Sequence, residues 1–272
     1  MRPFLKWAGN KYTIRQHILA TLPEGKRLIE PFMGSGAIFL NTHYEQYVLA
    51  EKNPDLVDLF KFIQQEGDSF IQDCLAYFCP KNNCAEKYNF YRDTFNQTLG
   101  KSKYKRKRAM LFVYLNRHGY NGLCRYNNQG YYNVPFGRYI KPTLSVERMN
   151  FFHQKSQHAI FELGDFRQTL TKAKKGDVVY CDPPYVPLTS SFPYVPGYFS
   201  LKDQEDLAKI AEALSQQGIC VIISNHDTPK TREYYKNARI HSLSVPRQIS
   251  CKSNNRNQAT EINAVYDSTK II

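Results

Sequence analysis

The sequence lacks long apolar runs. No segment approaches the roughly 20 apolar residues that a membrane-spanning helix needs. Residues 1–22 also lack the continuous apolar centre of a secretory signal. A hydrophobic content of 42% nevertheless suffices for a sizeable core. We therefore expect a soluble, intracellular protein with no membrane partner.

Paired cysteine motifs are absent as well. The seven cysteines are scattered, and Cys74, Cys79 and Cys84 are five residues apart with no C-x-x-C pair. An odd, scattered set indicates neither a disulfide framework nor a zinc site. We therefore expect reduced thiols, as is usual in the cytosol, and no bound metal.

Acidic residues are few relative to basic ones. The chain has 37 Lys and Arg against 24 Asp and Glu, which gives a formal charge of +13 and a pI near 9.3. Six cations fall within the eight residues Lys101–Arg108, and tyrosines lie among the cations between Tyr88 and Tyr139. A solvated charged surface is one explanation. A nucleic-acid partner is the other, because rings and cations together suit bases and phosphates.

Strand and helix patterns alternate at both ends of the chain. Strands are predicted at residues 26–30, 47–50, 160–163, 178–181, 220–224 and 262–266, with a helix at 201–215. In the middle, Asn53 and Pro54 start a helix. Helical periodicity continues through 70–78, 85–95 and 105–115. This alternation predicts an α/β fold with a mostly parallel sheet, interrupted by a helical insertion.

A polar segment at residues 118–139 follows the last of these helices. It is rich in Asn, Gly, Tyr and Arg. A turn at 127–130 and a returning strand at 131–134 would make it a hairpin.

The segment Asp182-Pro183-Pro184-Tyr185 follows the apolar run 177–181. Ligand sites of open α/β sheets lie at the carboxyl ends of strands. Two prolines hold a rigid, extended turn that donates no backbone hydrogen bonds. The segment therefore presents a carboxylate, carbonyls and a ring, a set that suits an amino group on a flat base.

A glycine turn, Glu30–Gly36, follows the first predicted strand, and Glu51 ends the next. Glycines there allow a ligand to approach closely, and an acid at the second strand end can bind ribose hydroxyls. The third glycine of a dinucleotide fingerprint is missing, so an adenosyl cofactor fits better than NAD. A tight turn without a ligand is the alternative. Trp7, the only Trp, is in isolation better explained by core packing.

Five motifs occur in a fixed order along the chain. They are F-L-K-W-A-G-x-K, E-P-F-x-G-x-G, N-R-x-G-Y-N-G-L-C-R-Y-N, N-V-P-F-G-R-Y and Y-C-D-P-P-Y. With these motifs the chain resembles the Dam-type DNA adenine-N6 methyltransferases over nearly its full length. The resemblance implies a Rossmann-like methyltransferase sheet in a domain of residues 1–54 and 145–272 that binds S-adenosyl-L-methionine. Residues 55–144 would form the target-recognition domain, with its hairpin at 118–139.

The resemblance also implies an activity. The protein would methylate N6 of a flipped adenine in double-stranded DNA, within GATC. Independently of the resemblance, nothing in the sequence suggests more than a monomer, and we expect it in the cytoplasm, associated with the nucleoid.

Residue roles follow from the same motifs. Asp182, Pro183 and Tyr185 would be catalytic. The cofactor pocket would be lined by Trp7, Lys11, Phe32, Gly34, Gly36, Glu51 and Asp182. Glu51 stands where the family more usually has Asp, and it keeps the carboxylate. The DNA contacts would be Lys6, Arg92, Arg117, Tyr120, Asn121, Leu123, Arg125, Asn127, Asn133, Pro135, Arg138 and Tyr139.

The chemistry of adenine explains these assignments. Its N6 lone pair is delocalised into the ring, so N6 is a poor nucleophile until hydrogen bonds localise that pair. The Asp182 carboxylate and the Pro183 carbonyl would accept the two N6 hydrogens while Tyr185 stacks on the flipped base. Arg125 would pair with a guanine edge. Tyr120 or Leu123 would wedge into the stack.

Two other functions are compatible with parts of the sequence. One is amino methylation of another target, such as cytosine N4. The family's cytosine-N4 relatives resemble S-P-P-aromatic at this site, so Asp182 argues against methylation of cytosine N4. The other is a catalytically inactive DNA-binding protein, which would have no need for the cofactor motifs around Trp7 and Gly34.

Overall fold

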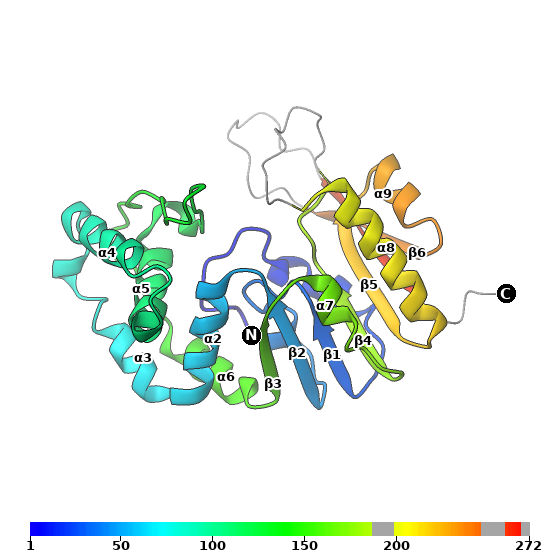
Figure 1. Cartoon of the computed structure of the whole chain (residues 1–272), viewed down its shortest axis with the longest axis horizontal. Helices are drawn as coiled ribbons and strands as arrows, with labels where there is room; N and C mark the ends of the chain where they lie inside the picture. Colours follow the sequence, from blue (N-terminus) through cyan, green and yellow to red (C-terminus); the bar gives the residue numbers. More distant parts are fainter. Residues whose placement is uncertain (187–198, 246–258, 268–272) are drawn as a thin grey trace. The chain divides into compact units, whose positions relative to one another are not determined.

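The computed structural model describes residues 1–186, 199–245 and 259–267 (Figure 1). Its α-helices are α1 (Arg15–Leu19), α2 (Pro54–Glu66), α3 (Asp68–Leu75), α4 (Ala85–Gln97), α5 (Lys105–His118), α6 (Val146–Ser156), α7 (Phe166–Leu170), α8 (Leu201–Gln216) and α9 (Pro229–Tyr234). Its strands are β1 (Arg27–Glu30), β2 (Gln46–Glu51), β3 (Ala159–Leu163), β4 (Asp177–Cys181), β5 (Cys220–His226), β6 (Arg239–Val245) and β7 (Ala259–Tyr266).

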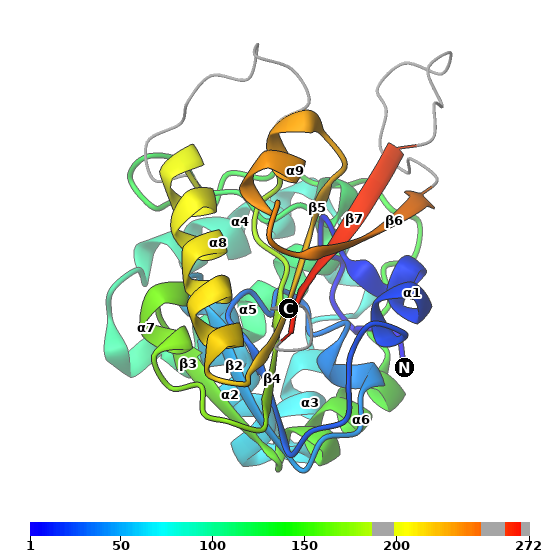
Figure 2. The ribbon, with the colours of Figure 1, turned by 90° about the vertical axis from the view of Figure 1, so that its right-hand side faces the viewer.

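The described strands form one seven-stranded sheet. Six of them lie in the order β2-β1-β4-β5-β7-β6. β1 pairs in parallel with β2 and β4, and β4 pairs in parallel with β5. β7 runs antiparallel to both β5 and β6, as Figure 2 shows. The predicted α/β fold with a mostly parallel sheet is confirmed.

The chain divides into two compact units. Unit 1 comprises Met1–Thr13, Gly34–Asn41 and Glu51–Leu163. Unit 2 comprises Ile14–Met33, Thr42–Ala50 and Gly164–Ile272. This division does not test the expected recognition domain at 55–144, which stays a prediction.

In unit 2, β4 is buried along its whole length. Its valines, Val178 and Val179, suit a strand that is covered on both faces, as parallel strands are. Helix α8 packs on β5 (Figure 1), and the apolar side of α8 joins the core around Val179 and Val221. The order of the sheet reverses at β1, because β2 lies on one side of it and β4 on the other. The carboxyl ends of β1 and β4 are therefore the expected ligand-binding end.

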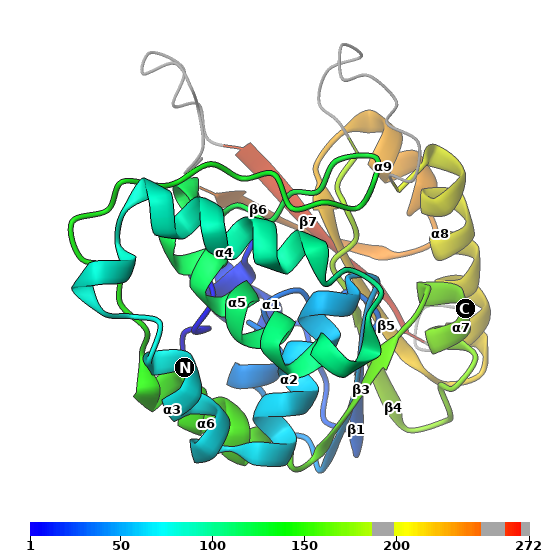
Figure 3. The same ribbon diagram turned by 60° about the vertical axis from the view of Figure 1, so that its left-hand side comes forward.

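In unit 1, α5 packs against α2, α3 and α4 (Figure 3). The predicted start of α2 is confirmed, because the Asn53 side chain accepts hydrogen bonds from the N–H groups of Asp55 and Leu56 and Pro54 opens the helix. Aromatic rings fill the core, and Phe60 and Phe152 stack with centroids 4.7 Å apart. The helices predicted within 70–115 are all present.

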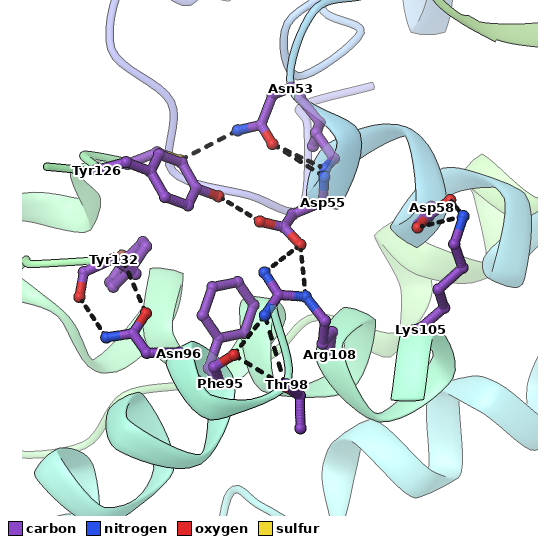
Figure 4. A network of polar contacts seen from close by, with 12 residues as sticks. Asn53, Asp55, Asp58, Phe95, Asn96, Thr98, Lys105, Arg108, Tyr126 and Tyr132 are labelled. Carbon is purple, nitrogen blue, oxygen red and sulfur yellow. Dashed lines mark hydrogen bonds and ion pairs between the residues drawn. The ribbon is translucent and has the colours of Figure 1, made fainter. Parts of the chain in front are cut away.

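A buried carboxylate joins α2, α5 and the 118–139 loop (Figure 4). Asp55 Oδ1 accepts hydrogen bonds from Arg108 Nε at 3.0 Å and Nη2 at 2.7 Å. The Tyr126 hydroxyl donates to Asp55 Oδ2 at 2.9 Å. Arg108 also donates to the Phe95 carbonyl and lies over the Phe95 ring. The Arg108 charge is thus fully partnered away from water, and Asp55 fixes Tyr126 to α2.

The cationic run Lys101–Arg108 is partly neutralised within unit 1. Arg108 pairs with Asp55, and Lys105 pairs with Asp58. Arg106 pairs with both Glu66 and Asp73. Lys101, Lys103 and Lys107 are exposed. Three of the six cations are therefore paired with acids of unit 1, and the other three are exposed.

Within the three described ranges, no helix is long and apolar enough to cross a membrane. In the same residues, no group of three or more His, Cys, Asp or Glu side chains could hold a metal ion. The described cysteines are free thiols, of which Cys74 and Cys181 are buried.

The Asp55 network predicts a large difference between two neighbouring carboxylates. Asp55→Ala should lower the free energy of unfolding by about 3–5 kcal/mol, because it leaves the buried Arg108 charge uncompensated. Asp58→Ala, on the same helix, removes a half-buried carboxylate whose partner, Lys105, is solvent-exposed, and should change the free energy of unfolding by about 0–1 kcal/mol. Urea unfolding of both variants measures the free energy of unfolding. Equal decreases in the two variants would show that the Asp55 network stabilises the fold no more than the Asp58 pair does.

Candidate active site and DNA-contacting loop

Gly34 and Gly36 of the glycine turn lie in unit 1, as does Glu51. Gly34 and Gly36 have φ angles of 48° and 75°, a region that disfavours other residues. Glu51 Oε2 accepts the Gly34 N–H at 3.2 Å, and Oε1 accepts those of Lys52 and Asn53 at 2.9 and 3.2 Å. An ionised carboxylate has about four acceptor positions, so the three N–H groups leave room for a further donor.

The pKa of Glu51 follows from the same surroundings. Burial raises this pKa, and the backbone N–H groups of Asn53, Lys52 and Gly34 lower it by stabilising the charged form. The carboxylate thus occupies a shielded position in which a hydroxyl donor would bind more strongly than in water.

Trp7 lies against the glycine turn. A Cβ atom on Gly34 would come within 3.0 Å of the Trp7 indole Nε1, so the turn has room for this ring only because Gly34 has no side chain. Trp7 is half-buried, unlike the core residue that its sequence context alone favoured. Asn10 Nδ2 donates to Ser35 Oγ at 3.2 Å and joins the two segments again. Lys11 is buried, and its ammonium group donates to the Gly9 carbonyl.

These unit 1 residues fit an adenosyl group. They offer a flat indole, a carboxylate at a strand end and a backbone turn that can be approached closely. A Cβ at Gly34 would fill this cradle. The predicted cofactor residues Trp7, Lys11, Gly34, Gly36 and Glu51 are therefore brought together within one unit.

Asp182-Pro183-Pro184-Tyr185 leaves the carboxyl end of β4 in unit 2, as predicted. The Tyr185 hydroxyl donates to Glu261 Oε2 at 2.8 Å. The Tyr185 ring stands edge-on to His226, with centroids 4.7 Å apart. Burial raises the pKa of Tyr185 well above its usual range, and the charges of Asp182 and Glu261 raise it further. Tyr185 is thus a neutral hydrogen-bond donor with a fixed ring.

Phe32, expected to line the cofactor pocket, belongs to an aromatic cluster of unit 2. Its ring stacks on Phe166, with centroids 5.5 Å apart, and meets Phe199 edge-on at the same distance. Phe32 is half-buried, so one part of the ring is covered by this cluster.

In unit 1, Lys6 lies beside the 118–139 loop. Asn116 clasps the Lys6 backbone, because it accepts the Lys6 N–H at 2.9 Å and donates to the Lys6 carbonyl at 2.7 Å. The same Asn116 amide donates to Gly122. The Lys6 ammonium group lies 3.7 Å from the centroid of the Tyr139 ring. The structure thus brings together two predicted DNA contacts from distant motifs, Lys6 and Tyr139. Asn116, the first residue of the N-R-x-G-Y-N motif, holds the Lys6 backbone.

The predicted returning strand at residues 131–134 is wrong. The described loop contains only two isolated bridges, Gly119↔Phe136 and Tyr126↔Tyr132. Side chains of α4 bind the backbone instead: Asn96 bonds both the N–H and the carbonyl of Tyr132, and Tyr88 donates to the Val134 carbonyl. The two arms of the loop are still joined by backbone hydrogen bonds, in which the N–H groups of Asn127 and Asn133 donate to the carbonyls of Tyr131 and Arg125 at 2.9 and 3.1 Å. The predicted turn is present, with Asn127 Oδ1 accepting from Gln129 and Tyr131 N–H.

Arg125 is exposed on this loop and is held by the residue opposite. Its Nε donates to Asn133 Oδ1 at 2.7 Å, and its Nη2 donates to the Asn133 carbonyl at 3.2 Å. Tyr126, its neighbour, is tied to Asp55 as described above. The guanidinium group is therefore presented at the surface from an anchored backbone.

The remaining predicted DNA contacts differ in exposure. Tyr120, Asn121, Asn133, Pro135 and Arg138 are exposed, and Tyr120 retains 51% of its accessible surface. Asn121 and Arg138 have positive φ angles of 52° and 53°. Leu123, Arg92 and Arg117 are half-buried. Arg117 donates to the Thr143 carbonyl, and burial lowers its pKa. The half-buried residues have less surface to offer DNA.

His118 is the last residue of α5 and binds the backbone of the 118–139 loop. Its ring stacks on Tyr114, with centroids 4.0 Å apart, and its carbonyl accepts the Gly137 N–H at 2.8 Å. Burial lowers the pKa of His118 to about 4, so the ring is neutral at pH 7. A neutral, buried ring marks His118 as a structural residue of the loop.

Comparisons with known proteins show which family this chain resembles. A family model described as D12 class N6 adenine-specific DNA methyltransferase matches residues 7–249. The DNA adenine methylase of Escherichia coli strain K12 is 45% identical over 268 residues, which cover 97% of this chain and 95% of that protein. The DNA adenine methylase of Vibrio cholerae serotype O1 strain O395 is 43% identical over 269 residues, with coverage of 97% and 96%.

The cradle around Gly34 predicts the effect of adding one methyl group. Gly34→Ala should weaken S-adenosylmethionine binding by about tenfold or more, because the new Cβ displaces Trp7 and strains a positive φ angle. Gly164→Ala is the control, since its Cβ would meet only a side-chain oxygen 3.6 Å away. Calorimetric titration of both variants with the cofactor measures this. An unchanged dissociation constant for Gly34→Ala would show that Trp7 does not line the cofactor pocket.

Proposed function

The chain belongs to the family of D12 class N6 adenine-specific DNA methyltransferases, and we propose that Asp182-Pro183-Pro184-Tyr185 catalyses its methyl transfer to adenine N6. The protein is a DNA adenine methyltransferase that uses S-adenosyl-L-methionine. The observation that supports this segment most is its position directly after β4, at the end of the sheet where ligands bind.

Trp7, Lys11, Gly34, Gly36 and Glu51 are the proposed cofactor-binding residues of unit 1. The Glu51 carboxylate accepts a hydrogen bond from a ribose hydroxyl, for which its fourth acceptor position is suited. The indole of Trp7 lies along the ligand, and the turn at Gly34 allows close approach. Phe32 and Asp182 complete the proposed set from unit 2. When bound, S-adenosylmethionine supplies a methyl group on a sulfonium, which is an electrophile.

Asp182 and Pro183 activate the substrate amine in this proposal. The Asp182 carboxylate and the Pro183 carbonyl accept the two N6 hydrogens, which localises the lone pair and offsets positive charge that develops on N6. Gln204 donates to the Pro184 carbonyl, whereas among the described residues none donates to the Pro183 carbonyl. This difference supports Pro183 as the substrate acceptor.

The target adenine must leave the duplex to reach these groups. Unstacking and unpairing cost a few kcal/mol. Tyr185 recovers part of this energy by stacking on the flipped base. Tyr120 is the better candidate for the wedge that fills the gap, because it is more exposed than Leu123.

Lys6 and Arg125 are the proposed base contacts of the protein. A paired hydrogen bond from Arg125 to a guanine edge discriminates by about 1–3 kcal/mol. The motifs favour GATC in double-stranded DNA as the target. Asn121, Asn127, Asn133, Pro135, Arg138 and Tyr139 complete the contact surface, and Arg92 and Arg117 contact the backbone. We further infer a monomer that acts in the cytoplasm at the nucleoid, where its substrate is.

One assay tests the central proposal. The protein is incubated with labelled S-adenosylmethionine and duplexes with or without GATC, and the DNA is then digested to nucleosides. N6-methyladenine should appear only in the GATC duplex. Asp182→Ala should abolish transfer while DNA affinity stays within about twofold, because Asp182 acts on the amine rather than on phosphates. Equal losses of both would contradict its assigned role.

Target choice gives an independent prediction. Arg125→Ala should reduce discrimination against duplexes with one altered guanine by about 1–3 kcal/mol. Lys107→Ala, a change at an exposed cation of α5, should at most weaken binding to all sequences equally and reduce its salt dependence. Rates on matched and altered sites measure this, and an unchanged site preference in Arg125→Ala would exclude it as a base contact.

A further inference from the structure

Three buried residues behind Asp182-Pro183-Pro184-Tyr185 form a hydrogen-bonded clamp. They are Gln204 in the first turn of α8, Asn225 near the end of β5 and Tyr235, which follows α9. We propose that they are positioning residues for methyl transfer, an inference that rests on the proposed role of the segment. All three are at most 2% exposed and belong to unit 2.

The clamp binds the backbone on both sides of Tyr185. Gln204 Nε2 donates to the Pro184 carbonyl at 2.8 Å. Asn225 Oδ1 accepts the Val186 N–H at 3.1 Å and the His226 N–H at 2.9 Å. One amide therefore holds the residue before the stacking ring, and the other holds the residue after it.

Hydrogen bonds within the clamp fix the orientation of its amides. The Tyr235 hydroxyl donates to Gln204 Oε1 at 3.0 Å. Asn225 Nδ2 donates to Gln204 Oε1 at 3.1 Å and to the Tyr235 oxygen at 3.0 Å. With its oxygen bound twice, Gln204 can turn only its NH₂ group toward Pro184. A buried, fully connected network of this kind specifies one arrangement of its members.

The prolines explain why such a clamp is needed. Neither Pro183 nor Pro184 has an N–H group, so these two residues can be tied to their surroundings only through their carbonyls. The N–H groups that follow are those of Tyr185 and Val186. The clamp uses the Pro184 carbonyl and the Val186 N–H. The Pro183 carbonyl stays available to the substrate amine, and the clamp fixes the backbone that follows it in the chain.

The consequence is kinetic. Misplacing a reacting group by about 1 Å costs on the order of 100-fold in rate. Loosening the clamp should therefore lower kcat, because the carbonyl and the ring would no longer be held in place. Affinity for DNA and cofactor should hardly change, since no clamp residue is among their proposed contacts.

Tyr235→Phe is the most selective test, because it removes one hydroxyl and keeps the buried ring. We expect kcat under single-turnover conditions to fall by about tenfold or more. The KM for GATC duplex and the dissociation constant of S-adenosylmethionine should stay within about twofold. Tyr266→Phe is the matched control: this tyrosine is buried in the same core, but no hydrogen bond joins it to the clamp. Its kcat should not change.

A second variant separates positioning from folding. Gln204→Met removes the bond to Pro184 with a side chain of similar length, and should lower kcat at least as much. Adding Tyr235→Phe to Gln204→Met should lower kcat little further, because both act through one contact. A Tyr235→Phe enzyme with unchanged kcat, or a matching loss in Tyr266→Phe, would overturn the clamp.

The two proposals fail in different ways. A wild-type protein that makes no N6-methyladenine, or an active Asp182→Ala variant, would refute the proposed role of the segment. Asp182-dependent activity that is insensitive to Tyr235→Phe would refute the clamp alone.

Discussion

The two missing N–H groups of Pro183 and Pro184 are the constraint on which unit 2 depends. They make the turn after β4 stiff, and they also deprive it of the donors that normally tie a loop to its surroundings. Long-range amides supply the ties instead: Gln204 comes from α8 and Asn225 from β5. The placement of α8 against β5 thus does more than cover the sheet, because it brings both amides to the same turn.

In unit 1, two carboxylates join segments that are distant in the sequence. Glu51 gathers the N–H groups of Gly34, Lys52 and Asn53 at the end of β2. Asp55, a few residues later, gathers Arg108 and Tyr126. The segment 51–55 therefore binds the glycine turn through Glu51 and the 118–139 loop through Asp55. Its acids are expensive to bury, and each is stabilised by several donors.

Local patterns in the sequence predicted most of the strands and helices because burial leaves a periodic signature. The valines of β4 and the Asn53-Pro54 start of α2 are examples. The strand expected at 131–134 is reduced to an isolated antiparallel bridge, Tyr126↔Tyr132, and Asn96 and Tyr88, distant in sequence, bind its backbone. β6 was not predicted, since an edge strand of mixed polarity is stabilised mainly by its pairing with β7.

The candidate site divides in the same way. Residues within motifs, such as Trp7, Gly34 and Asp182, could be named from the sequence. Supporting residues outside the motifs could not, because Gln204 and Tyr235 act through contacts that only the folded chain creates. A buried amide in a helix has the same local signature whether or not it holds a catalytic turn.

Net charge shows the same limit, with a consequence for DNA binding. Six cations in Lys101–Arg108 suggest a strong phosphate-binding surface, yet Lys105, Arg106 and Arg108 are paired with acids of unit 1. The exposed Lys101, Lys103 and Lys107 are left for phosphates. Each phosphate contact contributes roughly −0.9 to the slope of log affinity against log salt. The run therefore supports about half the salt dependence that its composition suggests, and the remainder must come from residues elsewhere, such as the exposed Arg138.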